Sequence, residues 1–214
     1  MRVAIAGGHG QIAMRLAKVL SERGDEAVGL IRNPDQSDDV RQAGAEPAVV
    51  DLEHASEDDV AQAIAGSDAV VFAAGAGPGS GAARKETMDY GGAAKLIAAA
   101  KQAGIRRYVI VSSMGANSNA RGDDTFSVYL RAKGRADDAV LASGLDATVV
   151  RPGSLTNDAG TGRVRLGASV PRGQVTRDDV AAVLVAVLDS PGTIGRTVDL
   201  IGGNTPVAEA VAAI

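Results

Sequence analysis

The segment from Gly7 to Gly10 constrains the fold of this chain more than any other, because it joins two stretches of different periodicity. Arg2–Ala6 is a short apolar run, and such runs form strands that are buried on both faces of a parallel sheet. Gln11–Glu22 follows with apolar residues at helical spacing. A strand, a glycine-rich turn and a helix in this order begin a βαβ unit, which predicts a parallel sheet with right-handed crossovers.

The same alternation of apolar runs and helical stretches continues along the rest of the sequence. Further strands are expected at residues 26–31, 46–50, 69–74, 108–112, 146–151 and 196–201, and helices at 35–43, 56–64, 84–103, 127–143, 177–188 and 206–214. Residues 153–175 are irregular, with one short strand at 163–166. We therefore predict an α/β fold, a Rossmann-type doubly wound parallel sheet with helices on both faces. Residues 1–214 would form a single domain, in which 153–175 and 190–214 make a small substrate-covering lobe.

Composition narrows the range of partners. The chain has 214 residues and a formal net charge of −4, so it lacks the basic stripe that binds nucleic acid. Its apolar runs are much shorter than the roughly 20 residues of a membrane-spanning helix, and its first residues show no cleavable signal pattern. With no cysteine and two histidines, we expect no disulfide, no thiol catalysis and no metal site. A cytoplasmic protein without nucleic-acid or membrane partners is the expectation.

Gly7, Gly10 and Ala13 are spaced much as in a dinucleotide-binding turn, which also joins a strand to a helix. Glycine allows positive φ and lets backbone N–H groups approach a pyrophosphate. The prediction is a cofactor-binding turn that consists of Gly7, Gly8, His9, Gly10, Gln11 and Ile12. The alternatives are a glycine-rich turn without a ligand and, for the His9 side chain, an exposed position in the loop.

The end of the second predicted strand distinguishes NADP from NAD. An acidic residue there usually holds the ribose 2′-hydroxyl, whereas an arginine holds a 2′-phosphate. Arg32 lies at this end without a neighbouring carboxylate, so NADP is favoured, and Arg15 is a weaker candidate for a second positive charge. Asp51 and Leu52 follow the third strand, where they are expected to contact adenine. The alternatives are a solvated Arg32 and an Asp51 that caps the next segment.

A serine, a tyrosine and a lysine follow the fifth predicted strand in an order that suits carbonyl chemistry. Tyr129 and Lys133 share one face of a helix because they are four residues apart, and Ser113 lies at the strand end. A lysine ammonium beside a phenol stabilises the phenolate, so Tyr129 becomes a better proton donor to a carbonyl oxygen. Ser113 would donate to the same oxygen, and Lys133 would also reach the nicotinamide ribose. The alternative for Tyr129 is a half-buried residue on an amphipathic helix.

Together these motifs resemble the short-chain dehydrogenase/reductase superfamily and, within it, the compact atypical NAD(P)H-binding group. That group includes NmrA-like regulators, flavin and biliverdin reductase-like proteins and epimerase/dehydratase homologues. The resemblance extends over nearly the whole chain through Gly7–Ala13, Met88–Gly92, Gly104–Ser113, Tyr129 with Lys133, Thr148–Gly153 and Val175–Ala181. It implies that the adenine ribose is lined by Ala73, Ala74 and Gly75, that the nicotinamide lies near Ser112, Ser113 and Pro152, and that the catalytic pair is Tyr129 and Lys133.

We therefore expect an NADPH-dependent oxidoreductase that reduces a small carbonyl, quinone or similar acceptor by hydride transfer. Two other functions stay open: a non-catalytic NADP(H)-binding redox sensor that reports to a protein partner, and a nucleotide-sugar epimerase or dehydratase. The epimerase or dehydratase is less favoured, because few residues follow the sixth predicted strand, and such enzymes usually carry a larger C-terminal substrate domain. The predicted helices at 84–103 and 127–143 would pair in a homodimer, and a monomer is equally compatible.

Overall fold

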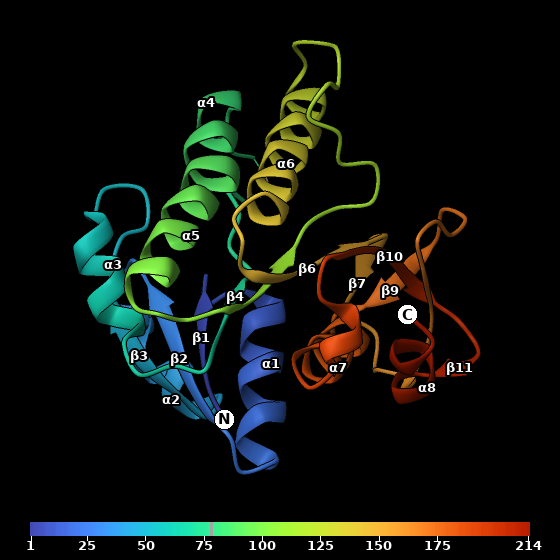
Figure 1. The fold of residues 1–214 in the computed structure, drawn as a ribbon, viewed down its shortest axis with the longest axis horizontal. Helices are drawn as coiled ribbons and strands as arrows, with labels where there is room; N and C mark the ends of the chain where they lie inside the picture. Colours follow the sequence, from blue (N-terminus) through green and yellow to red (C-terminus); the bar gives the residue numbers. More distant parts are fainter. Residues whose placement is uncertain (78) are drawn as a thin grey trace.

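The computed structural model describes residues 1–77 and 79–214, and it shows a twisted sheet between two layers of helices (Figure 1). In this part of the chain nine strands form the central sheet, in the order β11-β8-β10-β6-β5-β4-β1-β2-β3. Neighbouring strands from β10 to β3 pair in parallel, whereas β8 pairs antiparallel with β10 and β11 at one edge. The predicted Rossmann-type fold is confirmed.

The bounds of the elements are close to those predicted. The strands are β1 (Arg2–Ala6), β2 (Glu26–Ile31), β3 (Ala45–Val49), β4 (Ala69–Phe72), β5 (Arg107–Val111), β6 (Asp146–Pro152), β7 (Ser154–Thr156), β8 (Arg163–Gly167), β9 (Gln174–Thr176), β10 (Arg196–Gly202) and β11 (Thr205–Pro206). The α-helices are α1 (Gln11–Glu22), α2 (Ser37–Gln42), α3 (Glu57–Ile64), α4 (Ala82–Arg84), α5 (Ala93–Gln102), α6 (Thr125–Leu141), α7 (Arg177–Leu188) and α8 (Val207–Ala212). The remaining helical segments are η1 (Pro34–Gln36), η2 (Lys85–Gly92) and η3 (Pro191–Thr193).

Each face of the sheet has its own apolar core. Neighbouring residues of one strand point to opposite faces, so Val3 and Ile5 belong to one core and Ala4 and Ala6 to the other. Helices α1, α2, α7 and α8 contribute to the first core, and α3, α5 and α6 contribute to the second (Figure 1). Burial on both faces is the reason that the strands appear in the sequence as continuous apolar runs.

Side-chain caps determine where two of the helices begin. Ser56 caps α3, because its hydroxyl accepts the Asp59 N–H at 3.1 Å and the Asp59 carboxylate accepts the Ser56 N–H at 3.2 Å. Helix α6 begins at Thr125, earlier than the predicted residue 127. Asp124 is the reason, since its Oδ1 accepts the N–H groups of Phe126 and Ser127 at 3.0 Å each.

The single long helix predicted at 84–103 is wrong. The structure divides this region into α4, the π-helix η2 and α5. The wide turns of a π-helix change the face that each residue presents, and Lys85, Met88 and Asp89 are buried here. Gly92 allows the close approach to the sheet, because an added Cβ would lie 3.1 Å from the Met88 sulfur and 3.6 Å from the Phe72 ring.

The C-terminal part of the chain mainly extends the sheet. β10 pairs in parallel with β6, and β8, which includes the short strand predicted at 163–166, pairs antiparallel with β10. β7 and β9 form a separate two-stranded parallel sheet. In the described residues, no helix has both the length and the apolar character needed to cross a bilayer.

Candidate functional site

The turn between β1 and α1 has the geometry of a phosphate-binding turn. Gly7 has a φ of 80°, and an added Cβ would lie 2.7 Å from the Cα of Ala74. The Gly10 N–H donates to the Gly7 carbonyl at 2.7 Å. No side chain in the described residues caps the N-terminus of α1, and its first turn holds no acidic residue. The N–H groups at this end are therefore available to an anion.

The other predicted turn residues differ in what their side chains contact. An added Cβ on Gly8 would lie 2.7 Å from the backbone of β2, so this glycine serves packing. His9 pairs with Asp39 of α2, with 2.8 Å between Nε2 and Oδ2. The Ile12 side chain is buried in the core, and Gln11 is exposed and accepts a hydrogen bond from Arg15 through its carbonyl.

The Arg15 guanidinium lies between α1 and α7. Its Nε donates to Asp178 Oδ1 of α7 at 2.6 Å, and its Nη1 donates to the Gln11 carbonyl in the first turn of α1 at 3.0 Å. This ion pair links α1 to α7 across their shared face. The Arg15 charge is therefore already paired with Asp178, and its contact with a cofactor stays a prediction.

A first cavity, of about 280 Å³, lies at the carboxyl ends of β1 to β4. Nine of the predicted cofactor-binding residues line it, namely Gly7, His9, Gly10, Arg32, Asp51, Leu52, Ala73, Ala74 and Gly75. Gly8, Gln11, Ile12, Ser112, Lys133 and Pro152 lie outside its lining. Arg84 and Met88, which were not predicted, also line it. The topology thus gathers residues that are far apart in the sequence into one crevice.

Two arginines share a buried carboxylate at one corner of this cavity. Arg84 Nε donates to Glu53 Oε2 at 3.1 Å, and Arg32 Nη1 lies 3.6 Å from the same oxygen. Burial opposes ionisation of Glu53, but hydrogen bonds from Thr87 and Arg84 outweigh it and lower the pKa of the carboxyl. One carboxylate uses few of the donors on two guanidinium groups. The remaining donors can bind an anionic ligand.

Asp51 acts as a turn cap and also lines the first cavity. Its Oδ1 accepts the Glu53 N–H at 2.9 Å, and its Oδ2 lies 3.0 Å from His54 Nδ1. Burial of Asp51 disfavours its charge, but the contacts with His54 and the Glu53 N–H outweigh this and lower the pKa of Asp51. The capping alternative therefore occurs in the structure without removing Asp51 from the cavity.

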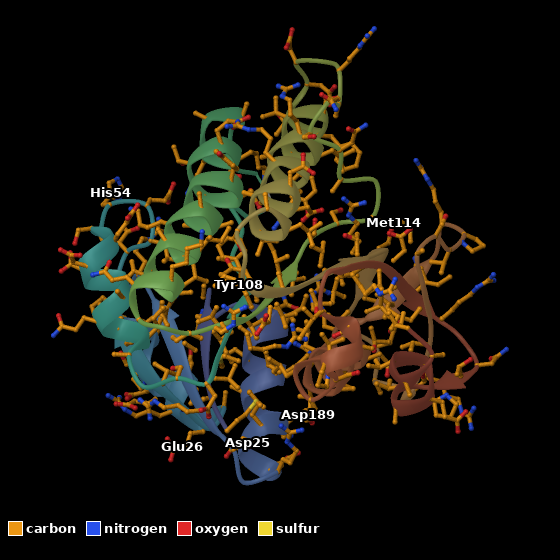
Figure 2. The ribbon with its side chains drawn as sticks, viewed as in Figure 1. Asp25, Glu26, His54, Tyr108, Met114 and Asp189 are labelled. Atoms are coloured by element: carbon orange, nitrogen blue, oxygen red, sulfur yellow. The ribbon has the colours of Figure 1, made fainter. Side chains whose placement is uncertain are left out.

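A second cavity, of about 560 Å³, lies at the carboxyl ends of β5 and β6. Ser113 and Pro152, both predicted for the nicotinamide side, line it together with Phe126 and Leu130 of α6. Met114 also lines this cavity, and Figure 2 shows it near β6 and β7. The two cavities lie along the same edge of the sheet, where a parallel α/β sheet binds its ligands.

The two serines after β5 have different surroundings. Ser112 is buried and its hydroxyl donates to Asp137 Oδ2 at 2.8 Å, an oxygen that also accepts from Arg151 Nε at 2.9 Å. Burial raises the pKa of Asp137, although Ser112 and Arg151 oppose the shift. Ser112 lines neither cavity, whereas Ser113 lines the second and makes a long contact of 3.4 Å with the Met114 carbonyl. Ser113 is the serine that can donate to a ligand.

Lys133 is buried between the ends of two strands. Its ammonium lies 3.2 Å from Asp89 Oδ1 and donates to the carbonyls of Val111 at 3.2 Å and Ala74 at 3.4 Å. Ala74 lines the first cavity, and Val111 precedes Ser113 of the second by two residues. Lys133 therefore lies between the two cavities, with partners inside the protein.

Tyr129 is half-buried and has two ammonium groups near its ring. The ring centroid lies 5.4 Å from Lys85 Nζ and 6.0 Å from Lys133 Nζ. The Phe126 ring stacks on it at 6.2 Å, and Phe126 lines the second cavity. Tyr129 itself is not among the residues that line either cavity, so it adjoins the second cavity beside Phe126.

The other two tyrosines are poorly placed to donate a proton at this edge. Tyr108 is completely buried beneath α5 (Figure 2), and burial raises its pKa far above the ordinary value. Its hydroxyl faces the Ala93 carbonyl at 3.4 Å. The Tyr90 ring is covered by the Arg135 guanidinium, 3.8 Å from the ring centroid.

Four residues that shape the site were not found from the sequence: Glu53, Arg84, Lys85 and Asp89. Arg84, Lys85 and Asp89 lie in the stretch interpreted as one regular helix, where nothing indicates the wide turns of η2. Asp89 belongs to the Met88–Gly92 motif, which the resemblance included without a role. In the described residues no group of His, Asp and Glu is arranged to hold a metal ion.

A doubly wound sheet with a glycine turn after β1 and cavities along its carboxyl edge defines a nucleotide-binding Rossmann protein. The chain matches the model of the NAD(P)H-binding family over residues 7–191 and belongs to this family. It is 39% identical over 212 residues to the uncharacterized sugar epimerase YhfK of Bacillus subtilis, covering 99% of each chain.

Solved structures agree with this assignment. A Bacillus halodurans protein, described as a candidate NAD-dependent epimerase/dehydratase, is 39% identical with a TM-score of 0.92, and each chain is covered completely. The oxidoreductase ylbE of Lactococcus lactis shares the fold with a TM-score of 0.87 at 24% identity, over 100% of this chain and 96% of that one. The predicted resemblance to the atypical short-chain dehydrogenase/reductase group is confirmed.

Proposed function

We propose that this protein is an NADPH-dependent oxidoreductase that reduces a small carbonyl, quinone or similar acceptor, with Ser113, Tyr129 and Lys133 as its catalytic residues. The observation that carries the proposal is the pair of cavities along one sheet edge, with Tyr129 and Lys133 at their boundary. The first cavity would hold the nucleotide and the second the acceptor.

The residues of the first cavity suit a dinucleotide. A pyrophosphate fits the uncapped N-terminus of α1, where the close approach of Gly7 to Ala74 leaves no room for a side chain. Arg32 and Arg84 have spare donors for a ribose 2′-phosphate, which favours NADPH over NADH. When bound, the cofactor supplies a hydride to the acceptor.

The residues of the chain would control the proton. Tyr129 donates its hydroxyl proton to the acceptor oxygen as the acceptor carbon gains the hydride, which gives an alcohol, and water then reprotonates the phenolate. The Ser113 hydroxyl donates a hydrogen bond to the same oxygen as negative charge develops there. Lys85 and Lys133 would stabilise the Tyr129 phenolate, because both ammonium groups lie near the Tyr129 ring.

A second candidate is a non-catalytic NADP(H)-binding redox sensor. One specific observation favours it: two residues expected around the nicotinamide already have partners inside the protein. Lys133 is paired with Asp89, and the Ser112 hydroxyl donates to Asp137. A sensor needs the first cavity intact and has no requirement for a proton donor at position 129.

The epimerase or dehydratase alternative is favoured by the names of two relatives, from Bacillus subtilis and Bacillus halodurans. Such a reaction regenerates the cofactor in each cycle. It therefore converts a nucleotide sugar without net consumption of NADPH, and this distinguishes it from reduction of an external acceptor.

The test is NADPH oxidation by the purified protein with aldehydes, ketones, quinones, flavins and biliverdin. Tyr129→Phe is compared with Tyr90→Phe, a matched change outside the two cavities. We expect Tyr129→Phe to lower kcat about 100-fold or more, the range for loss of a general acid, with NADPH affinity unchanged. Turnover that survives Tyr129→Phe would remove this residue from the mechanism.

Absence of turnover despite tight NADPH binding would favour the sensor. Interconversion of nucleotide sugars at constant NADPH would favour the epimerase.

A further inference from the structure

The second cavity has an apolar side and a polar side. Met114, Phe126 and Leu130 are apolar, and Phe126 is 65% exposed, which is unusual for a large apolar side chain. The polar side chains of the lining are Ser113, Ser154, Arg172 and Gln174. Among the residues lining this cavity there is one cation, Arg172, and no carboxylate. The lining is therefore amphipathic and positively charged.

The backbone that carries Arg172 is anchored. The Gly173 carbonyl accepts the Ser154 N–H at 3.0 Å, next to the pairing of β7 with β9. An added Cβ on Gly153 would lie 2.3 Å from that same carbonyl oxygen. Gly173 also packs against Ile201, where an added Cβ would meet the side chain at 3.1 Å. Arg172 thus projects from a backbone whose position is fixed by close packing on both sides.

The Arg172 guanidinium has no partner of its own in the part of the chain that the structure describes. Within the described residues no carboxylate forms an ion pair with it and its side chain donates no hydrogen bond, whereas Arg151 of β6 pairs with Asp137 at 2.8 Å. Arg172 is also exposed, so its donors stay hydrated until a ligand arrives. A planar guanidinium with free donors binds a carboxylate through two parallel hydrogen bonds.

We propose that the second cavity selects acceptors that carry a carboxylate on a flat apolar body, with Arg172 as the residue that recognises the carboxylate. The apolar body would lie against Phe126 and Leu130, and the reacting carbonyl would lie at Ser113. At about 560 Å³ the cavity is large enough for an aromatic ring system with one acidic substituent. This inference rests on the proposed function for its reaction and on the cavity alone for its binding.

The test compares acids with their methyl esters, which keep the shape and remove the charge. The probes are 4-carboxybenzaldehyde with methyl 4-formylbenzoate, and 6-formyl-2-naphthoic acid with its methyl ester. Binding to the protein saturated with NADP⁺ is measured by calorimetry, and KM and kcat are measured with NADPH. The variants are Arg172→Met, Arg172→Lys and the control Arg165→Met, which changes an exposed arginine of β8 outside this cavity.

We expect the wild-type protein to bind each acid about tenfold more tightly than its ester, as a hydrogen bond to a charged group would give. Arg172→Met should remove this preference and leave ester binding unchanged, Arg172→Lys should restore part of it, and Arg165→Met should have no effect. Equal affinity for acid and ester in the wild-type protein, or a preference that survives Arg172→Met, would overturn the proposal.

Binding and turnover separate this proposal from the proposed function. Acids that bind through Arg172 would support the anion site, and absence of NADPH oxidation with these acids and with every acceptor of the earlier panel would refute the reductase. Acids and esters that are reduced with equal KM would support the reductase and refute the role of Arg172.

Discussion

Replacement of Arg32 by alanine should remove the proposed preference for NADPH, so that NADPH and NADH bind about equally. The Arg32 side chain is 56% exposed and its Nη1 lies 3.6 Å from Glu53, so much of its hydrogen-bonding capacity remains for a phosphate. A hydrogen bond to a charged group contributes about 1.5–3 kcal/mol, and an exposed ion pair contributes about 0.2–1 kcal/mol. A half-exposed guanidinium on a dianion lies between these limits, at about 1.4 kcal/mol, which is tenfold in Kd.

The assay is calorimetric titration of Arg32→Ala with NADPH and with NADH at one ionic strength. We expect the Kd for NADPH to rise about tenfold, while the Kd for NADH changes less than twofold. Arg41→Ala is the matched control, because Arg41 is an exposed arginine of α2 that pairs with Asp38 at 2.7 Å and does not line the first cavity.

Added salt should weaken NADPH binding to the wild-type protein more than to Arg32→Ala, since salt screens the interaction of exposed charges. Equal losses for the two nucleotides in Arg32→Ala would refute the argument. They would mean that Arg32 contacts a part common to both, such as the adenine ring.

Two further predictions concern stability. Gly8→Ala should destabilise the fold by about 1–3 kcal/mol in urea unfolding, the usual cost of overpacking. Gly81→Ala is the control and should not destabilise it, because an added Cβ there meets nothing within 4 Å. Equal unfolding midpoints for the two variants would contradict the close packing of the turn on β2. The lowered pKa of Glu53 means that its contribution to stability is present above the ordinary value of 4.5 and is lost as the pH falls. Glu53→Gln should therefore flatten the decrease in thermal midpoint between about pH 5 and pH 3, and an unchanged acid profile would refute the assigned charge.

Most of the fold could be predicted from the sequence because the sheet is buried on both faces. Runs such as Arg2–Ala6 appear as continuous apolar segments, and glycine marks the ends of the helices that separate them. The differences between the predicted and the observed helices have local causes. Asp124 begins α6 two residues earlier than predicted, because an aspartate side chain accepts two N–H groups there. The π-helix η2 lies within a stretch whose apolar residues suit a regular helix, and its wider turns have no signal in the sequence.

The residues that line the first cavity were predicted more completely than the charged residues that pair beside it. Residues at strand ends follow from topology alone, and Arg32, Asp51 and Ala74 are found where the strand order places them. Arg84 could not be predicted, because it ends the short helix α4, which was not separated from the expected helix at 84–103. Glu53 could not be assigned either, since its burial follows from contacts with Arg84 and Thr87.

The Tyr129 and Lys133 pair shows what a spacing pattern leaves undetermined. A spacing of four residues on a helix places both side chains on one face, but it does not specify which other residues contact the lysine. Here Asp89, carried inward by η2, lies 3.2 Å from the Lys133 ammonium, so the pair acts on Tyr129 as a dipole. Lys85 donates to the Gly77 carbonyl and has no carboxylate partner in the described residues, and its ammonium lies closer to the Tyr129 ring, at 5.4 Å against 6.0 Å. The field of an uncompensated charge falls off more slowly than that of a dipole. Lys85 therefore contributes more positive potential at Tyr129, while Lys133 holds α6 to the ends of β4 and β5.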